Sequence, residues 1–569
     1  MAPVRADRWQ VLPIALITML YSPGVTAWFY QDDFGWLNLR HDVHSVSDLA
    51  TALFAPKAHG NMRPLGENAY WLTLSSIFGP DPLPFHIVTI LTQVASLLLL
   101  GALVRRLMAS ELAALAAQVL WIVSIGVATA LGWSSIYNQL LSAFFFLLAF
   151  YFLVRQRAVA HWIAFILGLG ALEINVVYPA LAAVYALLFA RDQLKRILPM
   201  FAVSALAVVV HFHFAPPPSA GVYSPTLDAR IFSTIWAYWS WALGPMPLGL
   251  TLFLTAAIAL LVASRHRRLA LLGLAWFAIP LLPYLPLPEH RMDYYLTVPC
   301  IGIALLGAAA VTEARWRVLT AACVLIYVGA SLPAGWKVTR WQHVRGDRVE
   351  HLVLGVDRIH QSDPRKIILL EGIDTDLFWS GIADLPFRAL SIPHVYLAPG
   401  QSASIQVAPD LLSKYVLPAA LARRALDGGT AVVYRFDGRM LHRTESATFP
   451  PEDEPHLVNV ADDVFQDYFG EGWRETPGGY RSMSGTATVR IGGPRLPGEH
   501  LYIGVFDTRP FRMSVRANGI DLPVELSHRD TDLSEFRTAL PAAALQWKQM
   551  EVSLTADRSP LLFGYLEVR

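Results

Sequence analysis

Two adjacent aspartates stand in an aromatic stretch near the start of the chain. Asp32 and Asp33 belong to "WFYQDDFGWLNL" at residues 28–39, directly after the first apolar segment. A carboxylate that is partly desolvated at a membrane edge has a raised pKa and is a better base. Two such groups can divide the work, one accepting a proton while the other orients a substrate or binds a divalent cation such as Mg or Mn. The structural alternative is a solvated loop in which an aspartate caps a helix.

A second polar stretch, "AHGNMRPLGENAYWLTLSSIFGPDPLPFH", occupies residues 58–86. Pro64 favours a helix start, and apolar residues then recur at helical spacing until the break at residues 79–84. We expect this helix to lie on the outer membrane surface without spanning it, with His59 and Arg63 at its start and near the aspartates. The guanidinium of Arg63 could then bind phosphate oxygens bidentately. The alternative is an interfacial anchor with a snorkelling arginine.

Three further loops carry candidate residues. The "GWSSIYNQ" turn contains Tyr137, and Glu173 lies alone between two apolar runs, where an ionisable residue is a functional candidate by default. "LPEHRMDYY" contains His290, Arg291 and Asp293, and a local anion would explain this basic pair. The structural alternatives are an exposed turn for Glu173 and a salt bridge from Arg291 to an acidic neighbour.

A membrane protein must position these groups. Of the 569 residues, 54% are hydrophobic and 16% are charged, and the mean hydropathy of +0.41 is too high for an ordinary soluble enzyme of this length. The net charge of +1 gives no support to nucleic-acid binding. A spanning helix needs about 20 mostly apolar residues. We therefore expect about eleven spans, near residues 9–28, 86–104, 111–131, 138–154, 160–173, 176–190, 197–214, 246–263, 269–286, 296–312 and 318–336.

The basic residues indicate the orientation of these spans. They cluster at alternate connections, which is the pattern of cytoplasmic loops, and we expect the amino terminus inside, as a retained signal anchor. The soluble tail and the polar loops then lie outside; if residues 160–173 and 176–190 formed one helix, the tail would lie inside. Trp236, Trp239 and Trp241 are typical of an aromatic belt at the interface, and contact with a sugar or lipid is the alternative. The six basic clusters are Arg5/Arg8, Arg105/Arg106, Arg155/Arg157, Arg191/Lys195/Arg196, Arg265/Arg267/Arg268 and Arg315/Arg317.

The soluble tail is expected to contain two parts, and neither contains a cysteine, so the tail needs no disulfide. Residues 340–448 combine short β-branched runs with a helix, which predicts a small α/β domain. Residues 457–569 have an all-β pattern. Asn518-Gly519 between alternating apolar residues predicts a hairpin whose returning strand continues to Leu526. About eight short strands favour a β-sandwich of the jelly-roll type, which either binds glycans or packs over the outer membrane face.

The sequence also lacks several motifs of soluble enzymes. It contains no phosphate-binding glycine-rich loop, no Cys/His spacing typical of a metal site and no Gly-x-Ser-x-Gly elbow. Cytoplasmic nucleotide chemistry therefore has no recognisable site. This favours an energy-rich substrate that is already in the membrane.

Five stretches occur in order over roughly residues 25–310: "FYQDDFGWLNL", "NMRPLGENAYWLTLSSIFGPDPLPFHIVTILTQVASLLLL", "GWSSIYNQLLSAFFFLLAF", "LEINVVYPALAAVYALLFARD" and "DYYLTVPCIGIALL". Together they resemble the GT-C superfamily of glycosyltransferases, which use polyprenyl-phosphate sugars. The closer likeness is to bacterial relatives of the transmembrane and tetratricopeptide-repeat mannosyltransferases. The chain departs from that pattern in two places. Leu172 replaces the lysine that precedes the glutamate matched by Glu173, and Asp-Tyr-Tyr at 293–295 replaces Glu-Arg-Tyr. No tetratricopeptide repeats follow.

The resemblance implies a bacterial plasma-membrane enzyme with a GT-C-like domain over residues 1–339, followed by an α/β domain and a β-sandwich outside the cytoplasm. It implies a polyprenyl-phosphate-linked sugar as donor and a glycan, lipid or protein as acceptor. Transfer would invert the anomeric carbon while Asp32 or Asp33 takes the acceptor's proton. The family pattern favours Asp32, with Asp33 adjusting the substrate or a metal, while Arg63 and Arg291 stabilise the departing phosphate. The other substrate-binding candidates are His59, Tyr137, Glu173, His290 and Asp293.

Two other functional classes stay open. A non-catalytic transporter or assembly scaffold for lipid-linked glycans is the first, and a transporter should show paired broken helices or charges deep in its spans. A polymerase or ligase of lipid-linked glycans is the second, and it would share the donor class and the membrane face.

Overall fold

A computed structural model describes residues 11–56, 61–216, 221–444, 449–476, 481–507, 509–529 and 533–569 of the chain. It divides into two compact units, Met1–Asp347 and Arg348–Arg569. His59, a predicted substrate-binding residue, lies outside the described residues, as do Arg5 and Arg8 of the first basic cluster. The predictions that rest on these three residues therefore stay predictions.

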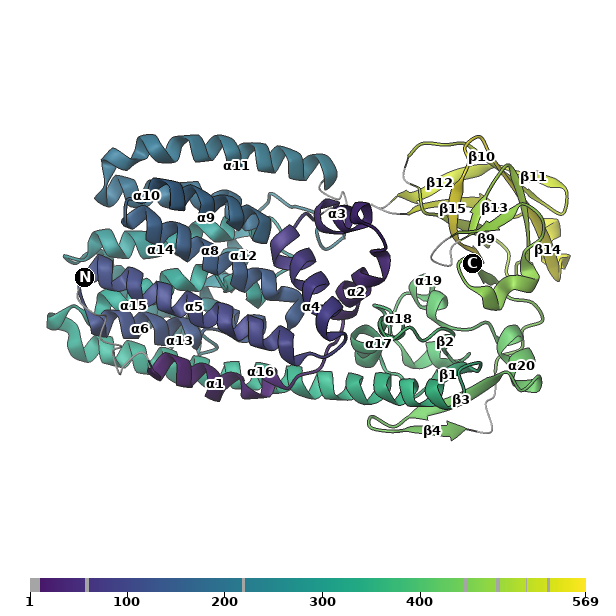
Figure 1. Cartoon of the computed structure of the whole chain (residues 1–569), viewed down its shortest axis with the longest axis horizontal. Helices are drawn as coiled ribbons and strands as arrows, with labels where there is room; N and C mark the ends of the chain where they lie inside the picture. The colour runs from purple at the N-terminus through teal and green to yellow at the C-terminus, as the bar shows by residue number, and fades with distance from the viewer. Residues whose placement is uncertain are drawn as a thin grey trace. The chain divides into compact units, whose positions relative to one another are not determined.

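The first unit is helical, and each expected apolar span coincides with a helix or a bent helix pair (Figure 1). Among the described residues, four helices are long and apolar enough to cross a membrane, or six if each of two bent pairs forms one span, so the expected number of about eleven stays a prediction. The helices are α1 (Val11–Val25), α5 (Leu83–Met108), α6 (Glu111–Ile122), α7 (Ile125–Gly132), α8 (Tyr137–Val154), α9 (Ala158–Ala171), α10 (Tyr178–Phe189), α11 (Leu194–Phe214), α12 (Arg230–Leu243), α13 (Leu248–Val262), α14 (Arg267–Leu281), α15 (Pro299–Val311) and α16 (Arg317–Ser362).

Two details of these helices differ from the expectation. The predicted span 111–131 bends by 59° where α6 gives way to α7, and α12 and α13 meet at 88°. The last helix, α16, runs unbroken for 46 residues, past the predicted end of its span at residue 336. The prediction included only the apolar part of α16 and missed its polar continuation, because hydropathy does not show where a helix continues into water.

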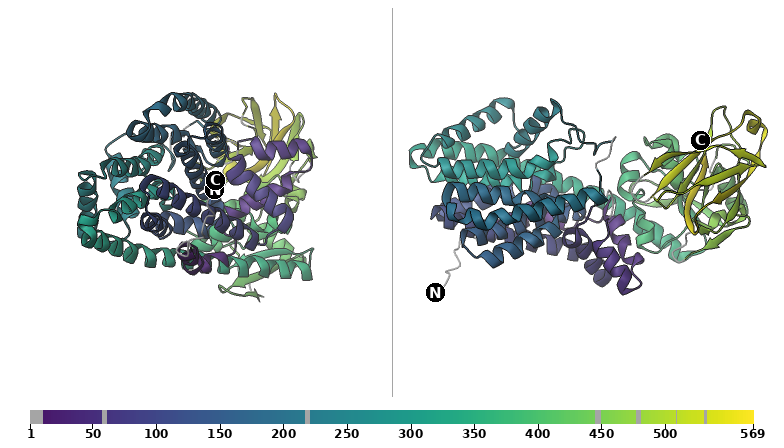
Figure 2. Two further views of the ribbon diagram at one scale, coloured as in Figure 1. Left: turned by 60° about the vertical axis from the view of Figure 1, so that its left-hand side comes forward. Right: turned by 90° about the horizontal axis from the view of Figure 1, so that it is seen from above.

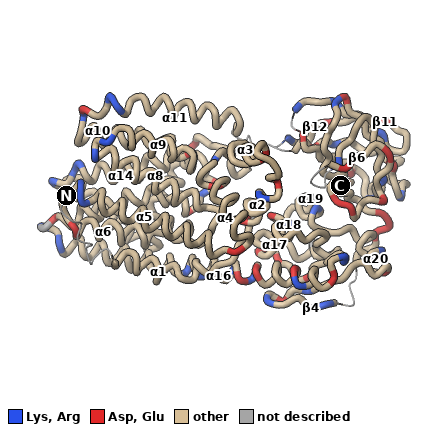
Figure 3. The backbone as a smooth tube through the Cα atoms, in the orientation of Figure 1, with Lys and Arg blue, Asp and Glu red and all other residues tan. Residues whose placement is uncertain are grey.

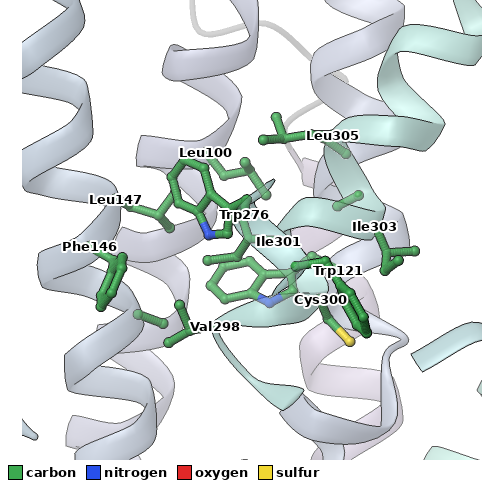
Figure 4. Packing of buried hydrophobic residues seen from close by; sticks show 14 of the residues in the cluster. Leu100, Trp121, Phe146, Leu147, Trp276, Val298, Cys300, Ile301, Ile303 and Leu305 are labelled. Carbon is green, nitrogen blue, oxygen red and sulfur yellow. The ribbon is translucent and has the colours of Figure 1, made fainter. Parts of the chain in front are cut away.

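The core of the helical unit is built from large apolar side chains. Trp121, Phe146 and Trp276 are fully buried, and Trp121 and Trp276 lie beside Ile301 of α15 (Figure 4). Helices α14 and α15 can approach closely because Gly302 has no side chain. A Cβ at this position would clash with the carbonyl oxygen of Gly273. Such close packing fixes the helix ends, and the candidate residues lie at one of these ends.

Charged residues lie mainly at the two ends of the helical unit. Figure 3 shows Lys and Arg gathered at the end beside the label N, while the middle of the bundle is almost uncharged. A band without charges between two polar ends is the pattern of a membrane-spanning bundle. The side of the membrane on which each end lies stays a prediction.

Short helices form the other end of this unit. They are α2 (Asp33–Leu37), η2 (Asn38–Asp42), α3 (Val46–Phe54), η4 (Pro64–Ala69) and α4 (Tyr70–Phe78). The helix predicted from Pro64 begins there as a π-helical turn, continues as α4 and ends at Gly79, which has φ of 62°. A side chain at Gly66 would clash with the carbonyl oxygen of Ala171, so η4 packs directly against the end of α9.

The second unit contains the predicted α/β part and a β-rich part (Figure 2). The α/β sheet has the order β2-β1-β3-β4, with β1 parallel to β2 and β3 and antiparallel pairing between β3 and β4. Its strands are β1 (Ile367–Glu371), β2 (Val395–Leu397), β3 (Ala431–Phe436) and β4 (Leu441–Thr444), and its helices include α17 (Thr375–Gly381) and α20 (Ala419–Asp427).

Two antiparallel sheets face each other across a shared apolar core in the β-rich part. The sheet orders are β11-β10-β14-β8 and β12-β13-β9-β15-β7-β6, with β5 also paired to β15. Apolar helices followed by an α/β segment and a β-sandwich thus confirm the predicted fold class, while the jelly-roll assignment stays a prediction. The strands are β5 (Leu457–Asn459), β6 (Trp473–Glu475), β7 (Arg481–Met483), β8 (Thr486–Gly492), β9 (His500–Val505), β10 (Met513–Ala517), β11 (Ile520–Leu522), β12 (Val524–Arg529), β13 (Ser534–Ala539), β14 (Gln549–Ala556) and β15 (Leu561–Val568).

The predicted hairpin at Asn518-Gly519 is confirmed, but its returning strand is shorter than expected. Both turn residues have positive φ, 46° and 81°, as this turn requires. β11 ends at Leu522, and β12, after Pro523, belongs to the other sheet. A proline has no N–H to donate to the ladder, so the chain leaves the first sheet at this residue.

Candidate active site around Asp32 and Asp33

The two aspartates occupy different environments although they are adjacent in sequence. Asp33 is 1% exposed, and its carboxylate accepts hydrogen bonds from the Ser135 hydroxyl at 2.5 Å and from the Tyr30 backbone N–H at 3.1 Å. Asp32 is exposed. Gln31 has φ of 56°, so the chain turns sharply just before the pair. The carboxylate of Asp33 is therefore buried in the protein interior, whereas that of Asp32 lies at the surface.

Burial is the main influence on the Asp33 carboxyl. It raises the pKa of Asp33 to about 7, against the opposing effect of the hydrogen bonds from Ser135 and Tyr30, while the nearby charge of Asp32 adds to the rise. An Asp with this pKa holds its proton over much of the range in which an exposed Asp is ionised. Asp33 can therefore be protonated near neutral pH.

The raised pKa of Asp33 predicts how stability depends on pH. Between pH 3.8 and about pH 7, the Asp33 carboxyl is protonated in the folded chain and ionised in the unfolded chain. The contribution of Asp33 to stability is therefore complete below 3.8 and is lost as pH rises through about 7. We expect the melting temperature of the wild type, followed by tryptophan fluorescence in detergent, to fall between pH 5 and pH 8 by more than that of Asp33→Asn. An equal fall in both proteins would show that Asp33 is not the titrating group.

Arg345, on α16, lies against the segment that precedes the aspartates, and sequence reasoning missed it. Its guanidinium lies over the Tyr30 ring, 5.3 Å from the centroid, and donates to Gln31 Oε1 at 2.9 Å. The next residue, Gly346, allows α16 to approach, since a Cβ there would lie 2.6 Å from the Trp28 carbonyl oxygen. In the sequence, Arg345 and Gly346 stand beyond the last apolar run. They were therefore assigned to the soluble tail.

Arg63 joins two carboxylates. Its Nε donates to both carboxylate oxygens of Glu173, at 2.9 and 2.8 Å, and its Nη1 donates to Glu67. Glu67, which is 3% exposed, also accepts from Asn138 Nδ2 at 2.6 Å. The structure therefore brings Arg63 and Glu173 together. Glu67 was not predicted, although its position four residues after Arg63 is the spacing of a helical ion pair.

This arrangement bears on the role expected for Arg63. The Nε and Nη1 of Arg63 already donate to Glu173 and Glu67, so the donors that a bidentate phosphate contact needs are occupied. Arg63 as the phosphate ligand stays a prediction, and the contacts in the structure instead give it the carboxylates of Glu173 and Glu67 as partners.

Tyrosines connect the remaining candidates to the aspartates. The Tyr223 ring lies 4.2 Å from that of His290, which is 8% exposed. Burial raises the pKa of Tyr223, the charge of Asp32 raises it further, and the charge of Arg63 lowers it, so both charges lie near this phenol. Asp32, Arg63 and His290 therefore all lie near Tyr223, while their predicted roles stay predictions.

The two carboxylates next to Arg291 in sequence, Asp293 and Glu289, have other partners. Asp293 accepts from the Thr129 hydroxyl at 2.8 Å, and Glu289 pairs with Arg230 at 3.2 Å. Within the described residues neither carboxylate forms an ion pair with Arg291, so the salt-bridge alternative is not found there. Arg291 is exposed and lines an open groove of about 630 Å³. The groove is lined by Ser233, Trp236, Ala237, Ser240, Trp241, Pro288, Glu289 and Arg291.

Tyr137 is buried at the start of α8. Its ring stacks on Tyr70 with centroids 4.0 Å apart, and its hydroxyl lies 3.1 Å from that of Thr92. These contacts join α8 to α4 and α5, and the role expected for Tyr137 in substrate binding stays a prediction.

The divalent cation considered for the aspartates would be held by Asp32 or Asp33. The described residues place a group of three His and Asp ligands only in the second unit.

Comparisons with known proteins find similarity in structure but not in sequence family. No family model matches the sequence, and no curated protein matches it. ArnT from Cupriavidus metallidurans bound to undecaprenyl phosphate is similar with 12% identity and a TM-score of 0.47, over 79% of this chain and 100% of that chain. The apo Archaeoglobus fulgidus oligosaccharyltransferase is similar with 10% identity and a TM-score of 0.41, over 98% of this chain and 96% of that chain. No residue role is carried from either protein to this chain.

Proposed function

We propose that the chain is a membrane glycosyltransferase that transfers a sugar from a polyprenyl-phosphate donor to an acceptor hydroxyl of a glycan, lipid or protein. The observation that carries the proposal is the carboxylate pair at the polar end of an apolar bundle. Asp32 is exposed to a substrate, and Asp33 is buried and hydrogen-bonded beside it. The five stretches that resemble GT-C glycosyltransferases lie in the same unit and include this pair.

The proposed reaction is a single inverting displacement. The acceptor oxygen forms a bond to the anomeric carbon while the bond from that carbon to the lipid-phosphate oxygen breaks, and the phosphate leaves with the bonding electrons. The acceptor's proton passes to the Asp32 carboxylate, because general bases must reach the proton and Asp33 faces the protein interior. Asp33 fixes the geometry of the loop that carries Asp32.

Positive charge must stabilise the leaving phosphate as its negative charge develops. Arg291 is exposed on the same polar end, and Arg345 lies over Tyr30 next to the aspartates. We assign these two arginines to the phosphate in preference to Arg63, because two carboxylates already surround the guanidinium of Arg63. We further propose that this end faces away from the cytoplasm, as the alternating basic loops predict.

The decisive experiment is a donor assay on the purified full-length protein in sealed vesicles. A panel of polyprenyl-phosphate hexoses and pentoses with radiolabelled sugars is added outside, and release of polyprenyl phosphate or transfer of label is measured. We expect turnover of at least one such donor and none of nucleotide sugars. If no member of the panel is consumed, with membranes opened by detergent as well as sealed, the proposal is wrong.

A second candidate, a transporter of lipid-linked glycans, is favoured by one observation. The two bent pairs, α6 with α7 and α12 with α13, are the broken helices expected of a transporter. The same vesicles distinguish the two functions. A transporter moves a fluorescent lipid-linked glycan between leaflets without consuming it, whereas a glycosyltransferase converts the donor to free polyprenyl phosphate.

A further inference from the structure

The second unit holds a cluster of metal-ligating side chains that the proposed reaction does not use. His394 precedes β2, and Asp462 and Asp463 lie at the start of η13 (Asp463–Tyr468). One ligand atom from each of the three lies within 4.8 Å of the others. His394 Nε2 and Asp463 Oδ1 are 2.5 Å apart. Two segments almost 70 residues apart thus place an imidazole and two carboxylates around one point.

Neighbouring groups hold two of these ligands in place. Asp462 accepts from the Tyr396 hydroxyl at 2.5 Å and from the Val464 N–H at 3.1 Å. The backbone carbonyl of His394 accepts from the Ile368 N–H at 2.9 Å, which ties it to β1. Ligands that are oriented by outer hydrogen bonds lose little freedom when a metal binds.

A cavity of about 280 Å³ opens beside the cluster. His394, Tyr396 and Asp462 line it, together with Arg388 and Lys414. Three protein ligands leave at least one coordination position for a water molecule or another oxygen ligand, which is the arrangement of an accessible metal centre. A cavity on the ligand side supplies the room that such an oxygen ligand needs.

We propose that His394, Asp462 and Asp463 bind one divalent transition-metal ion, of the class that includes Zn²⁺ and Mn²⁺. An imidazole ligand selects such ions over Ca²⁺ and Mg²⁺, which prefer oxygen ligands throughout. The ion replaces the hydrogen bond between His394 and Asp463: the neutral ring changes tautomer, so that its proton moves from Nε2 to Nδ1, and Nε2 gives its lone pair to the metal.

The test uses full-length protein in detergent, stripped with EDTA and then titrated with Mn²⁺ while free Mn²⁺ is followed by electron paramagnetic resonance. We expect one saturable equivalent, which is retained by the Asp32→Asn/Asp33→Asn double variant and is therefore separate from the membrane site. His394→Ala and Asp463→Asn should each weaken it by about tenfold or more. The matched control is His442→Ala, which should leave binding unchanged. His442 pairs with Asp437 at 2.9 Å, and the described residues place no third ligand beside them.

Co²⁺ gives a second readout that reports directly on the ligands. Its visible absorption should appear on binding to the wild type and should change in the milder variant His394→Gln, whose folding is checked by thermal melting. The proposal is wrong if the stripped wild type takes up no saturable equivalent. It is equally wrong if folded His394 and Asp463 variants bind the same equivalent with unchanged affinity and spectrum.

Discussion

Replacing Asp32 with asparagine is expected to lower the rate of sugar transfer by about 100-fold or more, because a general base contributes roughly 10²–10⁴ to such a reaction. Asparagine has nearly the same shape and keeps the exposed position of Asp32, so donor binding should change little. The loss should therefore appear in kcat rather than in KM. The measurement is initial-rate kinetics with the donor that the vesicle assay identifies.

The control for this variant is Asp42→Asn, which removes an exposed carboxylate at the end of the nearby short helix η2. We expect it to keep the wild-type rate, and both variants should melt at the wild-type temperature. A folded Asp32→Asn protein with wild-type kcat would refute the role of Asp32 as base. If Asp33→Asn alone abolished transfer, the proton would instead pass to Asp33.

Arg63→Ala is expected to destabilise the helical unit by about 3–5 kcal/mol, which is the cost of removing one partner from a buried ion pair. The substitution leaves Glu67, which is 3% exposed, without its cation and close to the second carboxylate of Glu173. The free energy of unfolding can be measured by denaturant titration in detergent. Part of the stability should return in Arg63→Ala/Glu67→Gln, because that double variant removes one of the uncompensated charges.

The matched control for the Arg63 prediction is Arg105→Ala. Arg105 pairs with Glu111 at 3.3 Å, but the Glu111 side chain is 57% exposed, so this pair is worth less than about 1 kcal/mol. Equal losses of stability in the two variants would mean that the contacts of Arg63 with Glu67 and Glu173 do not act as a buried ion pair.

Most of the helices and the best hairpin were predictable because their signals are local. An apolar run of helical length predicts a buried or spanning helix whatever lies elsewhere in the chain, and α5 and α11 follow their runs closely. Asn518-Gly519 predicts its turn because only residues that tolerate positive φ suit it. The shortened return strand was misread because alternation continues across Pro523, although the proline moves the chain to the other sheet.

By itself the sequence determined the apolar helices, the position of the acidic pair after the first of them, and the α/β and β-rich composition of the tail. The tertiary structure decided which side chains meet. Glu173 lies 110 residues after Arg63, and Arg345 lies 314 residues after Gln31, so their contacts depend on how helices pack. Only packing separates Asp32 from Asp33, because the Ser135 hydroxyl and the Tyr30 N–H reach one carboxylate. Periodicity encodes the face of an element, whereas burial and partners follow from the whole folded chain.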